Sequence, residues 1–428
     1  MRFPLFLPLA LLALLAPACT HFTPHPLDPA AAATRLTDRH LAAQSWTLSS
    51  LTAEATENHP SISLARAKYH TALAAAHTAA APPNPTLALS TQSVTPSTQW
   101  ITGTYGLDFD WTFETAGKSR ARLNQAHAEA RAAAATVIDT TWTVRAALRQ
   151  AFLQLSAANQ RQALLQQALR HQEALLHLLN HLLQTGAAAQ RSLAPAQILL
   201  AQLQRQAADA AKSSLLARAA LAEALGLSLP SLAQASFSFP AFPSSNPTLP
   251  SRTTALTHRA DILAALATYA AAEANLRLEI AKQYPDFHLN PGYSLDASEN
   301  KWALGFGLTL PLLNRNQGPI NQAEAQRAQA EAAFHAVQAQ ALADFDRATA
   351  TLTAAHQSLA LTKTALATQT KLTAREAHLL EVGASDRSAL LSAQVEQALA
   401  AAAHSDALAD VLAALGSLEA ATQTPIPL

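Results

Sequence analysis

The chain has 428 residues, which is enough for two domains or for one large elongated domain. Half of its residues are hydrophobic, yet only 5% are aromatic, and the 29 basic and 29 acidic residues give a formal net charge of zero. Without a basic surplus to neutralise phosphates, nucleic acid is excluded as an expected partner. Beyond the N-terminus no uninterrupted apolar run has the length that a membrane helix needs, so the sequence predicts no membrane-spanning helix.

Residues 1–18 have the features of a secretory signal peptide. A single arginine precedes an apolar stretch over residues 5–15, and a small-residue cleavage site ends at Ala18. The only cysteine, Cys19, follows directly and has no partner for an internal disulfide. The stretch LAPAC resembles the lipobox of bacterial lipoproteins, which predicts that Cys19 is acylated. Pro17 departs from that pattern, so plain cleavage before Cys19 is the alternative.

A stretch of alternating polarity, WITGTYGLDFDWTF, occupies residues 100–113. Side chains on a strand point alternately to opposite faces, so the pattern predicts a strand over about residues 101–113 with one apolar and one polar face. Asp108 and Asp110 lie on the polar face. The strand belongs either to a soluble sheet or to a membrane β-barrel. In a barrel, these carboxylates would face the lumen, either as a ring that selects cations or as ordinary solvated groups.

Two copies of one plan follow each other along the chain. Segments with similar sequences recur in the same order, spaced by about 200 residues, as expected for a tandem duplication. The matching segments are residues 84–87 and 284–287, 106–107 and 307–308, 117 and 318, and 182–186 and 379–383. We therefore predict a first repeat over residues 19–226 and a second over residues 259–428.

Each repeat is predicted to contain a helix, two strands and a long helical hairpin. In the first repeat, Ser49 is the expected N-cap of a helix that His59-Pro60 interrupts. The predicted strands cover about residues 86–94 and 101–113 in the first repeat and 287–295 and 302–310 in the second. The predicted hairpins cover about residues 118–225 and 319–420. Residues 227–258 contain five prolines and are predicted to form a linker draped outside the body.

The long helices show a seven-residue repeat of large apolar residues, which is typical of coiled-coil packing. The repeat comprises Leu148, Leu155, Leu169, Leu176 and Leu183 in the first copy, and Phe345, Leu352, Leu359, Leu366 and Leu380 in the second. A helix over residues 118–185 would be roughly 100 Å long, which no ordinary globular domain accommodates. Gly186 and Gly383 are expected to reverse the chain.

Four strands cannot close a membrane barrel, because the smallest barrels have about eight. An open sheet edge in lipid would leave backbone groups without hydrogen bonds, at a cost of several kcal/mol each. If the strands span a membrane, several identical chains must therefore share one barrel in a closed ring.

The duplicated plan, the export signal and the glycine turns of the hairpins resemble the TolC family of outer-membrane efflux channels, over essentially the whole chain after the signal peptide. Two motifs resemble its heavy-metal branch, which serves cobalt–zinc–cadmium pumps. These motifs are FETAGKSR at residues 113–120 and LPLLNRNQG at residues 310–318. The resemblance implies a mainly α fold with a small β part. It also implies a homotrimer that forms a twelve-stranded barrel in outer-membrane lipid and a periplasmic α-helical coiled-coil barrel.

The resemblance further implies a passive conduit that works with a periplasmic adaptor and an inner-membrane resistance-nodulation-division pump. Heavy-metal cations are the expected cargo, and drug efflux or type I protein secretion within the same family are alternatives. From another class, a soluble periplasmic coiled-coil adaptor lipoprotein would explain the heptads and the signal but not the two strand hairpins. The sequence contains none of the common motifs of enzymes or cofactor sites, so neither enzymatic activity nor a cofactor is expected.

The hairpin turns are the expected docking site for the adaptor. These tips combine Thr185, Gly186 and Ala187 in the first repeat with Val382, Gly383 and Ala384 in the second. Near the second tip, well-known family members carry aspartates that ring the closed periplasmic mouth. At the aligned positions this sequence has Ala389 and Ser392, and the nearest charges are Asp386 and Arg387. An acidic ring is therefore not carried over.

The sixteen histidines raise the question of a metal site. His177 and His181 lie four residues apart on one helical face, close enough to share a zinc ion. Such pairs are more often ordinary polar positions on a long helix, and structural zinc usually has four ligands. A metalloenzyme would rest on the histidine count alone.

Overall fold

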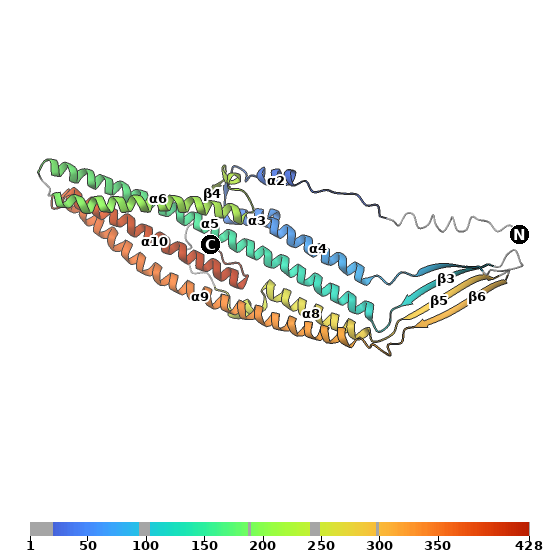
Figure 1. The fold of residues 1–428 in the computed structure, drawn as a ribbon. Coiled ribbons are helices and arrows are strands. Elements are labelled where there is room, and N and C mark those ends of the chain that lie inside the picture. Colours follow the sequence, from blue (N-terminus) through green and yellow to red (C-terminus); the bar gives the residue numbers. More distant parts are fainter. Residues whose placement is uncertain (1–19, 94–102, 187–189, 240–248, 297–298, 428) are drawn as a thin grey trace.

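The computed structural model describes residues 20–93, 103–186, 190–239, 249–296 and 299–427. The signal peptide, Cys19, the first strand turn and Ala187 lie outside the described residues. The molecule is elongated, with the strands at one end and the turns of two long helical hairpins at the other (Figure 1). Both predicted repeats are present in this arrangement.

The first repeat begins with short elements and continues into its hairpins. Its elements are α2 (Pro29–Thr37), β1 (Ser45–Trp46), α3 (Leu48–Asn58), α4 (Pro60–Ala80), β2 (Thr86–Ser93), β3 (Gly103–Phe113), α5 (Lys118–Gln184), η2 (Gln190–Ser192) and α6 (Leu193–Ala224). The predicted N-cap of α3 is wrong by two residues. Thr47 caps the helix, because its hydroxyl accepts from the N–H of Ser50 and the Ser50 hydroxyl reaches back to Thr47.

The second repeat has the same order of long elements. After η3 (Leu229–Leu232), β4 (Ser236–Phe237) and α7 (Arg252–Thr257) come α8 (Ala260–Ala281), β5 (Phe287–Asp296), β6 (Glu299–Leu308), α9 (Gln317–Glu381) and α10 (Arg387–Thr422). The second strand hairpin turns earlier than predicted, since β6 begins at Glu299. Each of the four predicted long strands is present.

The four long strands form one antiparallel sheet in the order β2-β3-β5-β6. The central pair, β3 and β5, joins the two repeats, whereas β2 and β6 are its edges. Helices continue this layer away from the sheet. The α5 helix packs against α4 and α8 near the strands, and against α6 and α10 nearer the tips (Figure 1). The α9 helix packs against α8 and α10. A single layer of helices therefore extends from the sheet.

The structure corrects the predicted correspondence between the strand regions. Gly106 pairs with Ser90 in β2, and the same place opposite Asn290 in the second hairpin is taken by Gly305, not by Gly307. The starts of the long helices indicate the same correspondence. Gly117 directly before α5 and Asn316 directly before α9 both have a left-handed backbone. In β6, the residues that correspond to those of β3 therefore lie two positions earlier in the sequence than predicted.

The hairpin tips confirm their predicted correspondence. Gly186 and Gly383 have φ values of 75° and 72°, a left-handed conformation that glycine adopts without strain. Above each turn a glutamine spans the two helices at the same place. Gln172 Nε2 donates to the carbonyl of Ala196 over 2.9 Å, and Gln369 Nε2 donates to that of Ala393 over 3.3 Å.

The prediction that residues 227–258 lie outside the body is wrong for the part of this segment that the structure describes. Leu232 and Ala255 are fully buried, and β4 pairs in parallel with β1. The ring of Phe239 lies 4.9 Å from that of Phe152, which belongs to the largest apolar cluster among the described residues. Proline ends long helices, but it leaves short apolar segments free to pack. Here Leu232 and Phe239 pack with α5 and α6, whereas α7, which contains Ala255, packs on α9 and α10.

The predicted heptad register holds only in the middle of the long helices. Leu148, Leu155 and Leu352 are buried, but toward the first tip burial moves to Leu165, Ala168, Gln172 and Leu175. There α5 lies between α6 and α10 and buries side chains toward both. A single apolar stripe along α5 faces only one neighbouring helix, so it cannot bury α5 against both α6 and α10.

By length and composition, one helix within the described residues is apolar enough to cross a membrane, contrary to the expectation from sequence. This helix is α10, and it packs along α5 and α9. Val395, Val411, Leu415 and Leu418 are among its buried residues. Core packing therefore accounts for the buried part of its apolar surface.

Candidate functional site

One face of the sheet carries large apolar side chains that no other described part of the chain covers. Trp302 and Phe306 are 82% and 78% exposed. The remaining exposed members are Leu87, Leu89, Tyr105, Leu107, Trp111, Phe113, Phe287, Leu295, Leu304 and Leu308. They follow the alternation that the sequence predicts. A continuous apolar surface of this kind marks contact with a membrane or a partner.

The opposite face of the sheet is polar. Asp110 Oδ1 lies 3.3 Å from His288 Nδ1, and Thr112 Oγ1 lies 3.2 Å from the same nitrogen. Asp108 faces Gly292, where an added Cβ would lie only 2.7 Å from its Oδ1. The two predicted aspartates therefore share a face with His288. That histidine was missed as a site residue, although its alternate position in β5 indicated this face.

A charged contact joins the two repeats where the sheet meets the helices. Lys118, only 7% exposed, donates from Nζ to Asp286 Oδ1 and to the carbonyl of Tyr284, both over 2.7 Å. The N–H of Thr115 donates to Asp286 over 2.8 Å. Burial opposes ionisation of Asp286, but these hydrogen bonds outweigh it and lower its pKa. The sequence motifs at residues 113–120 and 284–287 thus bind each other, which reading each motif alone did not show.

The two tips are exposed turns. In the second tip, the N–H of Gly383 donates to Leu380 and that of Ala384 donates to Leu379, so the last carbonyls of α9 are satisfied within the turn. Val382 is 62% exposed. In the first tip Thr185 and Gly186 are exposed in the same way. The described tip residues therefore offer a partner exposed side chains, and the second turn offers a backbone whose hydrogen bonds are already made.

The residues around the predicted aperture serve the start of α10. Asp386 accepts from the Ser388 hydroxyl over 2.6 Å and from the Ala389 N–H over 2.8 Å. These two hydrogen bonds lower its pKa, so the carboxylate is an N-cap. Arg387 and Ser392 are exposed nearby. The structure brings these residues together at the tip, but the acidic side chain is already engaged.

His177 and His181 both lie on the exposed side of α5. Within the described parts of the chain, no group of three or more histidine, cysteine, aspartate or glutamate side chains is placed to hold a metal ion. The pair lacks a third protein ligand there and remains a two-residue hypothesis.

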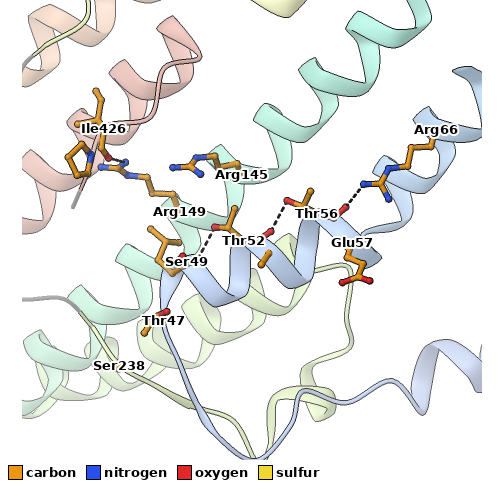
Figure 2. Close-up of a pocket in the computed structure, with 13 residues that line it drawn as sticks. Thr47, Ser49, Thr52, Thr56, Glu57, Arg66, Arg145, Arg149, Ser238 and Ile426 are labelled. Carbon is orange, nitrogen blue, oxygen red and sulfur yellow. Dashed lines mark hydrogen bonds between the residues drawn. The ribbon is translucent and has the colours of Figure 1, made fainter.

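A cleft of about 800 Å³ lies midway along the molecule, between α3, α5 and the C-terminal residues (Figure 2). Arg145 and Arg149 line one side, and hydroxyl groups of α3 line another. Both arginines bind the buried carboxylate of Glu419, and Arg149 also donates to the carbonyl of Ile426 over 2.8 Å. Burial lowers the pKa of Arg149 despite this partner. The cluster fastens the C-terminal residues to α5.

Most of the chain matches a known protein family. The profile of the family described as outer membrane efflux protein matches residues 51–227 and 252–423. The first segment overlaps the predicted repeat over residues 19–226, and the second overlaps the predicted repeat over residues 259–428. A search of curated protein sequences gives no match.

Several solved structures share this fold. VceC, an outer membrane protein from Vibrio cholerae, is 23% identical with a TM-score of 0.69, covering 88% of this chain and 95% of VceC. The open state of the MtrE outer membrane channel from Neisseria gonorrhoeae is 18% identical with a TM-score of 0.70, covering 90% and 94%. CusC is 18% identical with a TM-score of 0.70, covering 90% and 93%. These similarities confirm the predicted mainly helical, tandem-repeat fold class.

Proposed function

This chain belongs to the outer membrane efflux protein family, and from that premise we propose that it is the outer-membrane channel of a pump–adaptor–channel efflux system. The observation that carries the proposal is the combination of two surfaces in one chain. An uncovered apolar sheet face suits lipid, and the 67-residue helix α5 continues from that sheet into a long helical body. A channel that crosses the outer membrane and the periplasm needs both. The solved structures that share the fold include outer-membrane channels, not enzymes.

We propose a homotrimer. The sheet has two open edges, β2 and β6, and four strands do not close a barrel. Three copies joined edge to edge supply twelve strands. The polar face with Asp108, Asp110 and His288 would then line the lumen.

The proposed cargo is heavy-metal cations, exported with the help of a periplasmic adaptor and an inner-membrane resistance-nodulation-division pump. The support is the pair of motifs at residues 113–120 and 310–318, together with the carboxylates on the polar face. Drug efflux and protein secretion are the competing cargoes. The exposed aromatic face speaks against a soluble adaptor, because water-soluble surfaces rarely carry a large continuous apolar patch.

The test is complementation with matched cargoes. The chain would be expressed, with its own adaptor and pump, in a Gram-negative strain that lacks an outer-membrane channel. We expect restored resistance to zinc, cobalt or cadmium without restored drug resistance or protein secretion. Restored drug resistance alone would reject the metal cargo and keep the channel. No restored export of any cargo, with the protein present in the outer membrane, would reject the channel itself.

We further propose that Cys19 is acylated after removal of residues 1–18. Its position directly after the signal sequence supports this. Mass spectrometry of the mature N-terminus should show a lipid-modified cysteine. A free thiol at position 19 would reject the anchor and leave the channel unaffected.

A further inference from the structure

The arginine side of the cleft midway along the molecule carries more positive charge than its own carboxylate neutralises (Figure 2). The guanidinium groups of Arg145 and Arg149 share the single carboxylate of Glu419, so two positive charges meet one negative charge. Nε and Nη2 of Arg149 are buried and have no hydrogen-bond partner within the described parts of the chain. A buried charged group that lacks partners is costly, and an additional anion nearby would offset that cost.

Arg145 brings this excess charge to the surface of the cleft. Its side chain is 34% exposed, whereas that of Arg149 is 3% exposed. Its Nε donates to Glu419, and its guanidinium carbon lies 5.4 Å from the ring centre of Trp142. Neither of its terminal nitrogens has a hydrogen-bond partner among the residues that the structure describes. Arg145 is therefore held in place with free donors, and a planar guanidinium fits the two oxygens of a carboxylate.

The start of α3 lines the same cleft and also favours a negative charge. Its first turn, at Leu48 and Ser49, is the positive end of the helix dipole. The hydroxyls of Thr52 and Thr56 already donate to helix carbonyls, whereas that of Ser49 has no partner among the described residues. Glu57 is the acidic residue of the lining, and it lies near the other end of α3. The start of α3 thus adds a donor to the arginine side.

The rest of the lining is suited to more than an inorganic ion. Leu48 and Ala53 of α3 and Ile426 and Pro427 near the C-terminus contribute apolar surface. The volume of about 800 Å³ lies within the range of small-molecule sites in proteins. Such sites combine apolar walls with a few polar groups that fix the orientation of the ligand. The cleft therefore has a place for a charged head and a place for an apolar body.

We propose that this cleft binds a small organic carboxylate, with its carboxylate on Arg145 and Ser49 and its apolar body between α3 and the C-terminal residues. Arg149 lies behind Arg145 and acts through its charge. A ligand held in this way would contact α3, α5 and the C-terminal residues at once, and it would stabilise the fold that brings them together. The site is independent of the proposed channel function, because every residue in it belongs to one chain.

The test is isothermal titration calorimetry of the full chain purified in a non-ionic detergent, with benzoate as the probe. Benzamide has the same ring and a neutral head, and inorganic phosphate is an anion without an apolar body. We expect benzoate to bind at one saturable site per chain. Both control ligands should bind at least about tenfold more weakly, because benzamide loses the charge-assisted hydrogen bonds and phosphate loses the apolar contacts.

Three variants place the binding in the cleft. Arg145→Gln should weaken benzoate binding at least about tenfold, while Glu419 keeps Arg149 as its partner. Ala53→Trp fills the cleft from α3 without changing either arginine, and it serves if Arg145→Gln does not fold. It should abolish binding. Arg131→Gln removes an exposed arginine from the same helix and should bind benzoate as wild type does.

Several results would overturn the proposal. Wild type that does not bind benzoate has no such site, and a folded cleft variant with unchanged affinity places the binding elsewhere. Benzamide or phosphate binding as tightly as benzoate would reject the organic carboxylate as the ligand class. Equal weakening in Arg131→Gln would assign the effect to overall charge. Because none of these measurements depends on export, the proposed function is tested separately.

Discussion

The sheet and the helical body of this chain treat large apolar side chains in opposite ways. In the body, Phe152, Leu221 and Leu232 have no exposed surface. In the sheet, Trp302 and Phe306 are almost fully exposed. The body is thus stabilised by its own interior, whereas the sheet depends on what surrounds it. The difference teaches that the helical body is built for water, whereas the sheet is suited to the lipid that the proposed function places around it.

The largest effect is expected in the body, from removal of the buried carboxylate of Glu419. Glu419→Ala leaves Arg149 charged and buried without its partner, and breaking a buried pair costs about 3–5 kcal/mol. Thermal unfolding followed by circular dichroism in detergent should show a marked loss of stability. Glu396→Ala, at an exposed position of the same helix, is the control and should change little. Equal effects would show that the body does not depend on this cluster.

The next effect belongs to the sheet and should appear only in lipid. Phe306→Arg places a charge on the apolar face and should cost about 2–4 kcal/mol if the residue lies near the bilayer midplane. Asp110→Asn, on the polar face, should cost little. Folding into lipid vesicles, measured by heat-resistant migration on gels, compares them. Equal tolerance at both positions would indicate a sheet surrounded by water.

A smaller effect is expected at the contact between the two regions. Asp286→Asn removes a charge-assisted hydrogen bond, and such bonds contribute about 1.5–3 kcal/mol. Since the folded-state pKa of Asp286 is lowered, its stabilisation is fully present above the ordinary carboxyl pKa of about 3.9 and is lost as the pH falls through the folded value.

Unfolding between neutral pH and pH 3 checks this prediction. Wild type should lose stability on acidification, and Asp286→Asn should lose less over the same range. Asp209→Asn, in an exposed pair with Arg205, is the control and should follow wild type. If Asp286→Asn loses as much stability as wild type, the contact does not contribute as proposed.

The smallest effect on stability is expected at the tips, together with a complete effect on export. Ala384→Glu changes an exposed side chain of the turn and should leave unfolding and trimer assembly unchanged. If the adaptor docks there, metal resistance should be lost, whereas Ala384→Ser should retain it. Full resistance in an assembled Ala384→Glu trimer would move the docking site elsewhere.

Much of the contrast between the sheet and the helical body could be predicted from the sequence, because it depends on local rules. Alternation along β3 and β6 follows from the two-residue period of a strand, whatever lies on each side. Gly186 and Gly383 were found as turns because a left-handed residue favours glycine at any helix end. The same reasoning placed Asp108 and Asp110 on the polar face, where they lie with His288.

Features that depend on distant partners were not readable in this way. The five prolines between the repeats concealed Leu232, which is buried against α5 and α6, and Ala255, whose helix α7 packs on α9 and α10. The two-residue error at Gly307 arose because glycine-rich strands match in more than one register. Nothing local to Glu419 indicated that Arg149, 270 residues earlier, is its partner.

The position of the repeat boundary in the sheet has a consequence for how the chain folds. Each hairpin closes a short loop, but β3 and β5 meet only when residues such as Thr104 and Asp296, 192 positions apart, come together. Closing so long a loop costs entropy before any contact repays it, and contacts of high sequence separation slow folding. We therefore expect the two hairpins to form early and independently. The two hairpins can join into one sheet only when the second repeat is available. We therefore expect the pairing of β3 with β5 to be a late step in folding.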